Sequence, residues 1–406
     1  MRIRRWVKDV MQATIIFGIC AGVILTVSVI ADNIGNGHKA VMVSKDVNSN
    51  LDCDELTCQN VDISDGNSVD TANYMSGTDY MVNYDGNNAI YSDALSKISA
   101  KKIVCWGDSI TWGVGYEENT YIKQGDNVID ASNWNYPDTL RYLTGMDVYN
   151  LGVNGETSYE IALRQGGIKM YVDKQVTVKQ GKKVQINIAD EAGNPVILEN
   201  FNGYQSDNEE PENVVYINDK PYQLEYDNGN LYISMYNDTT TKSVKIKKGS
   251  QVVTKAAHDI TGDVLVIQMG SNGGWDDYDD LIEQYKSMIA NSGTECYIIV
   301  GDTDNPDESI DSANYSDSAE VGTDDTLWEA ALREAFGEHF INMRTYMLEN
   351  ALDIAGLEPT EDDISDLEQG RIPERVKYDY THLNSYGYYV IGTGVYEKGV
   401  ELGYWK

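Results

Sequence analysis

The stretch Lys102-Ile103-Val104-Cys105-Trp106-Gly107-Asp108-Ser109 decides the fold of this 406-residue chain. It joins a short apolar run directly to a glycine, a carboxylate and a serine. An uninterrupted apolar run of this length is typical of a buried strand in a parallel sheet. Since α/β sheets bind ligands at the carboxyl ends of their strands, we expect Ser109 to lie at the edge of a functional site.

Strand-length apolar runs alternate with helical patterns along much of the remaining chain. Further runs occupy residues 147–151, 263–269, 295–300 and 339–343. Apolar residues recur at helical spacing within residues 281–289, after the Asp276-Asp277 pair, and again within residues 328–335. This alternation predicts an α/β fold with a central parallel sheet and helices on both of its faces.

The alternation is interrupted between residues 168 and 258. Short β-type runs take its place, at residues 175–178, 184–188, 214–217 and 231–235. Asp227-Asn228-Gly229-Asn230 is typical of a tight hairpin turn. We therefore predict an inserted all-β module at residues 168–258, within an α/β domain made of residues 100–167 and 259–406.

The N-terminal residues indicate export. Four basic residues lie among the first eight, and an uncharged apolar run follows at residues 13–31. A helix of about 19 residues would reach roughly 28 Å, close to the hydrocarbon thickness of a bilayer. The positive flank predicts a cytoplasmic tail of residues 1–12 and a single-pass anchor in the cell membrane, with everything after it outside. The competing interpretation is a signal peptide that is cleaved near Ala31, which would give a secreted protein.

Residues 32–99 are rich in Asn, Asp, Ser and Gly and read as a low-complexity stalk. Within it, Cys53 and Cys58 could form a small disulfide loop after export or remain free thiols. Cys105 and Cys296 fall in predicted strands and are expected to be apolar core residues. The sequence has no zinc-type Cys/His spacing.

The formal net charge of −34 argues against a nucleic-acid partner, because phosphate binding requires a basic face. Two acidic segments could be mistaken for metal sites. Residues 302–325 lack the ligand spacing of a calcium loop and are expected to form a solvated loop. Glu361-Asp362-Asp363 is expected to begin a helix, where carboxylates are favoured.

Three side chains could carry nucleophilic catalysis. A serine needs a base to take its proton, and a carboxylate can orient that base. Asp379 lies three residues before His382 in Asp379-Tyr380-Thr381-His382, so one loop can carry both groups. We expect Ser109 to be the nucleophile, His382 the base and Asp379 its orienting carboxylate.

These motifs resemble, in order, the blocks of the SGNH or GDSL-like hydrolases. Gly107-Asp108-Ser109 looks like the first block, Asn154-Gly155-Glu156 is similar to part of the second, Gly270-Ser271-Asn272-Gly273 resembles the third, and the segment from Asp379 to His382 resembles the last. The resemblance implies a three-layer α/β/α, flavodoxin-like fold. It also implies an oxyanion hole formed by the backbone N–H groups of Ser109 and Gly155 and by the side-chain amide of Asn272. One departure is Gly273, where the family more commonly has Asp.

The resemblance implies a serine esterase that works through an acyl-enzyme and needs no metal or cofactor. Export and the family likeness point to acetyl or other short acyl groups on carbohydrate as substrate. The 29 tyrosines fit stacking on sugars, and they fit ordinary packing equally well. Two alternatives remain: an O-acyltransferase that passes the acyl group to a glycan through the same triad, and a non-catalytic carbohydrate-binding surface protein.

Overall fold

The computed structural model describes residues 102–125, 127–196, 213–238, 240–304 and 325–405 in full. Of residues 11–20, 23–34, 37–45, 72–74 and 80–82 it describes the backbone alone. The chain divides into two units, Met1–Ser96 and Lys97–Lys406.

The described segments of the first unit are strands. Its strands are β1 (Met11–Cys20), β2 (Val23–Ile34), β3 (Gly37–Lys45), β4 (Ala72–Tyr74) and β5 (Tyr80–Val82). The first three form an antiparallel sheet in the order β1-β2-β3, and β4 pairs with β5.

The predicted membrane anchor coincides with β1 and β2 in the structure. Among the described residues, no helix combines the length and the apolar character needed to cross a membrane. The anchor and its alternative, a cleaved signal peptide, stay predictions. The predicted tail of residues 1–12 lies almost entirely outside the described residues, as do Cys53 and Cys58.

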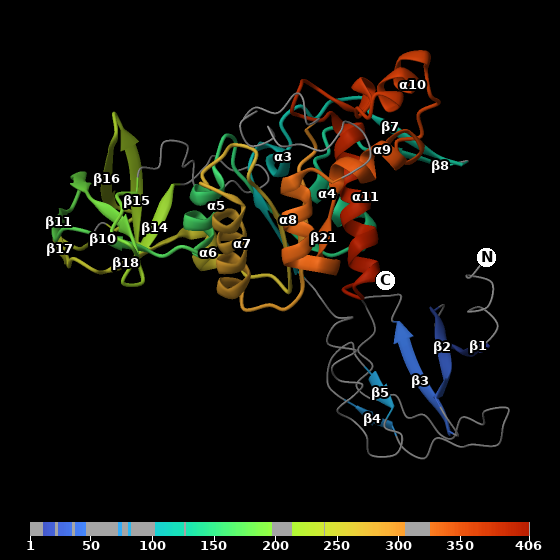
Figure 1. Cartoon of the computed structure of the whole chain (residues 1–406). Coiled ribbons are helices and arrows are strands. Elements are labelled where there is room, and N and C mark those ends of the chain that lie inside the picture. Colours follow the sequence, from blue (N-terminus) through green and yellow to red (C-terminus); the bar gives the residue numbers. More distant parts are fainter. Residues whose placement is uncertain are drawn as a thin grey trace. The chain divides into compact units, whose positions relative to one another are not determined.

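The second unit is built on a five-stranded parallel sheet, as the sequence predicts (Figure 1). Its strands are β6 (Lys102–Gly107), β9 (Asp147–Gly152), β19 (Val264–Gln268), β20 (Tyr297–Val300) and β21 (Phe340–Ile341). They lie in the order β21-β20-β19-β6-β9, and every neighbouring pair is parallel. The run at residues 339–343 gives only a two-residue strand, because His339 ends a 3-10 helix and Met343 begins an α-helix.

Helices cover both faces of this sheet. The helices described in this unit are α3 (Ser109–Trp112), α4 (Tyr136–Thr144), α5 (Ser158–Gln165), α6 (Lys255–Asp259), α7 (Tyr278–Ser292), α8 (Leu327–Phe336), α9 (Met343–Ile354), α10 (Glu361–Glu368) and α11 (Ser385–Glu401), with 3-10 turns η1 (Gly337–His339) and η2 (Glu374–Val376). Helices α4, α9 and α11 pack on one face of the sheet, and α5, α7 and α8 pack on the other. A short hairpin, β7 (Tyr121–Gln124) and β8 (Asn127–Asp130), completes the domain.

Alternating strand residues point into two separate cores. Ile103 and Cys105 of β6 belong to one core, with residues of α4, α9 and α11. Val104 and Trp106 belong to the other, with residues of α5, α7 and α8. Both sets are at least 97% buried, which explains why the strand reads as a continuous apolar run. Cys105 is a core residue as expected, whereas Cys296 is only half-buried and precedes β20.

The described strands of the inserted module form two antiparallel sheets. Its strands are β10 (Met170–Val172), β11 (Val176–Lys179), β12 (Val184–Ile186), β13 (Ile188–Asp190), β14 (Val214–Ile217), β15 (Lys220–Asp227), β16 (Asn230–Met235), β17 (Ser243–Ile246) and β18 (Gln251–Thr254). Seven of them form one sheet in the order β12-β16-β15-β14-β18-β10-β13, and β11 pairs with β17. Asn228 and Gly229 join β15 to β16, and both have a positive φ, as a type I′ turn requires. The short helix α6 corrects the expectation that residues 168–258 are all β, since it begins within them.

Helix α5 connects the module to the α/β domain, as Figure 1 shows. Its Leu163 is buried in the core of the module, while Ile161 and Ala162 lie in a core of the parallel sheet. Tyr159 donates a hydrogen bond to Asp190 of β13 (2.8 Å), and Thr254 of β18 donates one to the carbonyl oxygen of Arg164 (2.6 Å). The module therefore holds the helix that follows Gly155.

Candidate active site

Three neighbouring strands bring the candidate residues to one edge of the sheet. Ser109 follows β6, Gly155 follows β9 and Asn272 follows β19. These strands are adjacent, in the order β9-β6-β19, and Gly107 at the end of β6 pairs with the last residue of each neighbour. Segments that lie as far apart in the chain as Ser109 and Asn272 therefore meet at the carboxyl ends of the strands.

Ser109 is the first residue of the one-turn helix α3. Asp108 caps this helix by accepting a hydrogen bond from the backbone N–H of Ile110 (3.0 Å). The turn needs glycine at 107, because a Cβ there would collide with the Thr111 side chain and the Gln268 carbonyl oxygen. Gly113 ends the helix with φ of +102°, a conformation that other residues rarely adopt. Ser109 itself is 8% exposed.

His382 bridges Ser109 and Asp379. Its Nε2 lies 3.0 Å from Ser109 Oγ, and its Nδ1 lies 2.8 Å from Asp379 Oδ2. An ionised carboxylate can only accept, so the proton of a neutral imidazole belongs on Nδ1. Nε2 is then left with a lone pair that can accept the hydroxyl proton of Ser109. The structure thus brings together the three side chains that the sequence proposes as a triad.

Backbone donors hold Asp379 in place and keep it ionised. Its Oδ1 accepts hydrogen bonds from the N–H groups of Thr381 (2.9 Å) and His382 (2.7 Å). Partial burial alone would raise the pKa of Asp379. The two backbone hydrogen bonds and the contact with the imidazole have the larger effect, and together they lower the pKa of Asp379 below its ordinary value of 3.8. Asp379 is therefore a carboxylate at neutral pH.

Two further carboxylates support the loops of the site. Thr381 donates its hydroxyl to Asp304 (2.9 Å), and Ser271 donates its hydroxyl to Asp302 (3.0 Å). Both carboxylates are buried, and they lie in the short segment after β20. Burial, and next the negative charge of Asp302, hold the pKa of Asp304 well above its ordinary value. The expectation of a solvated loop is wrong for Asp302 and Asp304, which are both buried. Because they follow a buried strand of the sheet, their carboxylates lie at the edge of the candidate site. Residues 305–324 lie outside the described residues.

The second and third blocks are joined at Asn272. Its side-chain Nδ2 donates a hydrogen bond to the carbonyl oxygen of Glu156 (3.1 Å). Ser158 donates both its backbone N–H (3.0 Å) and its hydroxyl (3.1 Å) to the carbonyl oxygen of Gly273. Because an amide nitrogen carries two hydrogens, this bond uses only one of the two N–H donors of the Asn272 side chain.

Asp108 gives the stability of the protein a dependence on pH. Burial raises its pKa from 3.8 to about 7, helped by the charges of Asp302 and Glu156, and its Oδ2 has no hydrogen-bond partner among the described residues. The folded state therefore binds this proton more tightly than the unfolded state. The stability that Asp108 contributes is intact below its unfolded pKa and falls as the pH rises towards its folded pKa.

We expect Asp108→Asn to reduce this loss, because Asn can still cap α3 but cannot ionise. At about 1.4 kcal/mol per pKa unit, the free energy of unfolding should lose on the order of 4 kcal/mol less between pH 4 and pH 8 in the variant. Urea denaturation at both pH values measures this. Any effect of the substitution on stability that does not depend on pH cancels, because the free energies of unfolding at pH 4 and pH 8 are compared within each protein. An unchanged pH dependence would contradict the assignment.

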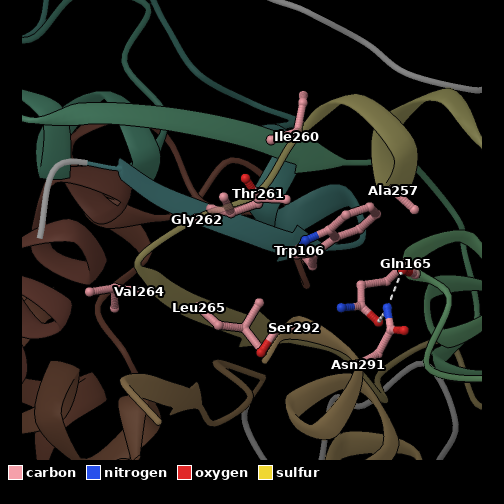
Figure 2. Close-up of a pocket in the computed structure, with 11 residues that line it drawn as sticks. Trp106, Gln165, Ala257, Ile260, Thr261, Gly262, Val264, Leu265, Asn291 and Ser292 are labelled. Atoms are coloured by element: carbon pink, nitrogen blue, oxygen red, sulfur yellow. Dashed lines mark hydrogen bonds between the residues drawn. The ribbon is translucent and has the colours of Figure 1, made fainter. Parts of the chain in front are cut away.

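The structure also contains a small pocket that is not the candidate site (Figure 2). Its volume is about 70 Å³, and it lies among α5, α6, α7 and the sheet, with Trp106, Gln165 and Asn291 in its wall. Asn291 donates a hydrogen bond to the carbonyl oxygen of Gln165 (3.0 Å) at this place. Ligand pockets are several times larger, on the order of 300 Å³ or more. None of Ser109, Asp379 and His382 lines this pocket.

The sequence did not point to four buried charged residues around the site, Glu156, Arg164, Asp302 and Asp304. Signals for them exist. Arg164 directly follows the apolar stretch Ile161-Ala162-Leu163, and the two aspartates lie within four residues of the end of a buried strand. Neither a protein-family model, nor a curated protein, nor a solved structure matches this chain.

Proposed function

We propose that this protein is an exported serine esterase of the SGNH type that hydrolyses acetyl or other short acyl esters, with carbohydrate as the alcohol. One observation carries the proposal: His382 Nε2 lies 3.0 Å from Ser109 Oγ while its Nδ1 lies 2.8 Å from an ionised Asp379. Nucleophile, base and orienting carboxylate in this sequence of contacts are the parts of a serine hydrolase.

The topology supports the family. Numbered by their order in the chain, the strands of the parallel sheet lie in the order 2-1-3-4-5. This is the order of flavodoxin-like sheets, in which the site lies at the carboxyl ends of the strands. Helices on both faces complete the three-layer arrangement that the SGNH resemblance implies.

Acylation begins when Ser109 Oγ attacks the carbonyl carbon of the ester and its proton passes to His382 Nε2. Asp379 stabilises the imidazolium that forms. The tetrahedral intermediate carries its negative charge on the former carbonyl oxygen. His382 then gives the proton to the leaving alcohol oxygen, the C–O bond to the alcohol breaks, and the acyl group remains on Ser109.

Deacylation repeats these steps with water. His382 Nε2 takes a proton from a water molecule whose oxygen attacks the acyl carbon, and it returns that proton to Ser109 Oγ as the acid leaves. In both halves the oxyanion lies between the N–H groups of Ser109 and Gly155 and the Asn272 amide. Fixed donors of this kind stabilise the transition state more than the ground state.

Asn272→Ala is expected to lower kcat by roughly 10²- to 10³-fold, the usual cost of removing one oxyanion donor. KM should change little, because the donor acts on charge that develops in the transition state. Steady-state kinetics with nitrophenyl acetate measures both. Asn350→Ala is a matched control: Asn350 of α9 likewise donates its amide to a backbone carbonyl, that of Tyr346 (2.8 Å). A kcat unchanged by Asn272→Ala would remove Asn272 from the mechanism.

Exposed tyrosines beside the triad support a carbohydrate as the alcohol. Tyr378 and Tyr380 flank Asp379 and are 58% and 57% exposed. Tyr116, in the loop after α3, is 45% exposed, and the neighbouring Gly115 packs against Tyr378. Tyrosine rings combine an apolar face with a hydroxyl, which suits them to sugar rings.

The deciding experiment assays the purified full chain on nitrophenyl esters of increasing acyl length and on acetylated polysaccharides. We expect hydrolysis of acetyl esters and release of acetate from the polysaccharide. Hydrolysis of long acyl chains alone would refute the carbohydrate assignment, and no hydrolysis of any ester would refute the esterase. With an oligosaccharide acceptor in the same assay, acyl transfer in place of acetate release would identify the acyltransferase.

A further inference from the structure

A buried ion pair lies behind the site. Glu156 and Arg164 have fully buried side chains, with Arg164 Nη2 2.7 Å from Glu156 Oε2. Arg164 Nε lies 2.8 Å from each carboxylate oxygen. The guanidinium also stacks over the Trp106 ring, 4.9 Å from its centroid. A charged pair without solvent must be held by good geometry, or its desolvation would exceed its attraction.

This ion pair contacts each of the three segments that carry the proposed oxyanion donors. Arg164 Nη2 donates to the carbonyl oxygens of Leu151 (2.7 Å) and Gly107 (3.4 Å). Leu151 belongs to β9, which leads to Gly155, and Gly107 ends β6, which leads to Ser109.

The third segment is reached through Glu156. Its carboxylate holds Arg164, its backbone follows Gly155 directly, and its carbonyl oxygen accepts the Asn272 amide (3.1 Å). The orientation of the Asn272 amide therefore depends on where the Glu156 backbone lies. Arg164 in turn lies on α5, where Thr254 of the module holds its carbonyl oxygen.

We propose that Glu156 and Arg164 are a positioning pair that sets the spacing of the Ser109 N–H, the Gly155 N–H and the Asn272 amide. This inference rests on the proposed function, because it assigns the pair a role in the same oxyanion hole. Neither residue touches the substrate. The pair acts through the backbones that it fixes, and a displacement of reacting groups by about 1 Å can cost on the order of 10² in rate.

Because the pair is buried, removing one partner destabilises the protein more than replacing both partners. Removing one partner leaves an unpaired buried charge, whereas replacing both with apolar residues of similar volume is often neutral for stability. The double variant Glu156→Leu/Arg164→Met therefore removes the hydrogen bonds within the pair and those from Arg164 to Leu151 and Gly107 without leaving a charge. The Glu156 backbone carbonyl that accepts the Asn272 amide is kept, but the side-chain contacts that fix its position are lost. Arg164→Lys is a second variant, which keeps the charge but cannot donate in a planar fork.

The test measures kcat and KM of full-chain variants on nitrophenyl acetate, together with thermal unfolding. We expect Glu156→Leu/Arg164→Met to unfold cooperatively and to lose on the order of 10² in kcat, with KM within twofold of the parent protein. Arg164→Lys should show the same kind of loss, in kcat and not in KM. A residue with a merely structural role would change the unfolding temperature and leave kcat of the folded enzyme unchanged.

A second buried pair provides the control. Arg344 of α9 donates to Glu329 of α8 through Nε (2.8 Å) and Nη2 (2.7 Å), and Glu329 also accepts the backbone N–H of Thr326 (2.7 Å). Glu329→Leu/Arg344→Met thus removes a comparable set of buried hydrogen bonds. We expect it to retain the parent kcat, whatever it does to the unfolding temperature.

The outcomes separate this proposal from the proposed function. An inactive parent protein would refute the esterase itself. An active parent with an equally active Glu156→Leu/Arg164→Met variant would overturn the positioning role alone, as would equal losses of kcat in the two double variants. If Glu156→Leu/Arg164→Met does not fold, Arg164→Lys decides: a parent-like kcat there overturns the proposal.

Discussion

Ser109→Ala is expected to lower kcat for ester hydrolysis by roughly 10⁶-fold, the loss seen when the nucleophile of a serine-hydrolase triad is removed. The reason is chemical, because the variant cannot form an acyl-enzyme and His382 Nε2 loses the hydroxyl that lies 3.0 Å away. A residual rate above that of water should remain, since the oxyanion donors are still present. The change deletes one oxygen of a side chain that is already largely buried, so the fold should be retained.

The measurement combines kinetics with covalent labelling. A fluorophosphonate should attach to the parent protein at one serine, with loss of fluoride, and mass spectrometry of peptides should place it on Ser109. Ser109→Ala should take up no label. Ser287→Ala is the control, because Ser287 of α7 also uses its hydroxyl within the protein, donating to the Gln284 carbonyl oxygen (2.7 Å). Full activity in Ser109→Ala would end the proposed mechanism.

The parallel sheet could be predicted from the sequence because each of its strands is buried on both faces. Residues such as Val104 and Cys105 point to opposite cores and are both apolar. The apolar run can therefore be recognised as a buried strand without knowing which strands lie beside it. The order of the strands and the faces covered by each helix required the structure. The same holds for the module, where β14 pairs with β18 across a long stretch of chain. The continuous run at 184–188 in fact divides between β12 and β13.

The candidate triad could be proposed from the sequence because Asp379 and His382 share a loop and Ser109 follows a recognisable strand. The supporting charges could not, since their meaning depends on which side chains pack together inside the protein. Glu156 meets Arg164 inside the protein, and Asp304 reaches Thr381 across 77 positions of the chain. A single charged residue in a sequence is normally predicted to lie on the protein surface. Only the three-dimensional structure shows that such a residue is buried and paired.

Asp379→Asn tests the orientation of the base, with an expected loss of roughly 10⁴-fold in kcat. Asn retains an oxygen that can accept the N–H groups of Thr381 and His382, so the loop should keep its geometry. The other position becomes an NH₂ group that donates towards His382 Nδ1. The imidazole must then carry its proton on Nε2, and it can no longer accept the proton of Ser109.

The pKa of Asp379 gives this prediction a pH range. Because the folded protein holds that pKa below 3.8, the carboxylate is ionised throughout the neutral range and the parent protein has its orienting charge there. The variant should therefore be impaired at every pH from about 5 to 8 and should not recover within that range. Steady-state kinetics across these pH values measures it, with Asp353→Asn on the exposed side of α9 as the control. A loss of less than tenfold would mean that His382 keeps its working tautomer without Asp379, and the carboxylate would then be a support for the loop alone.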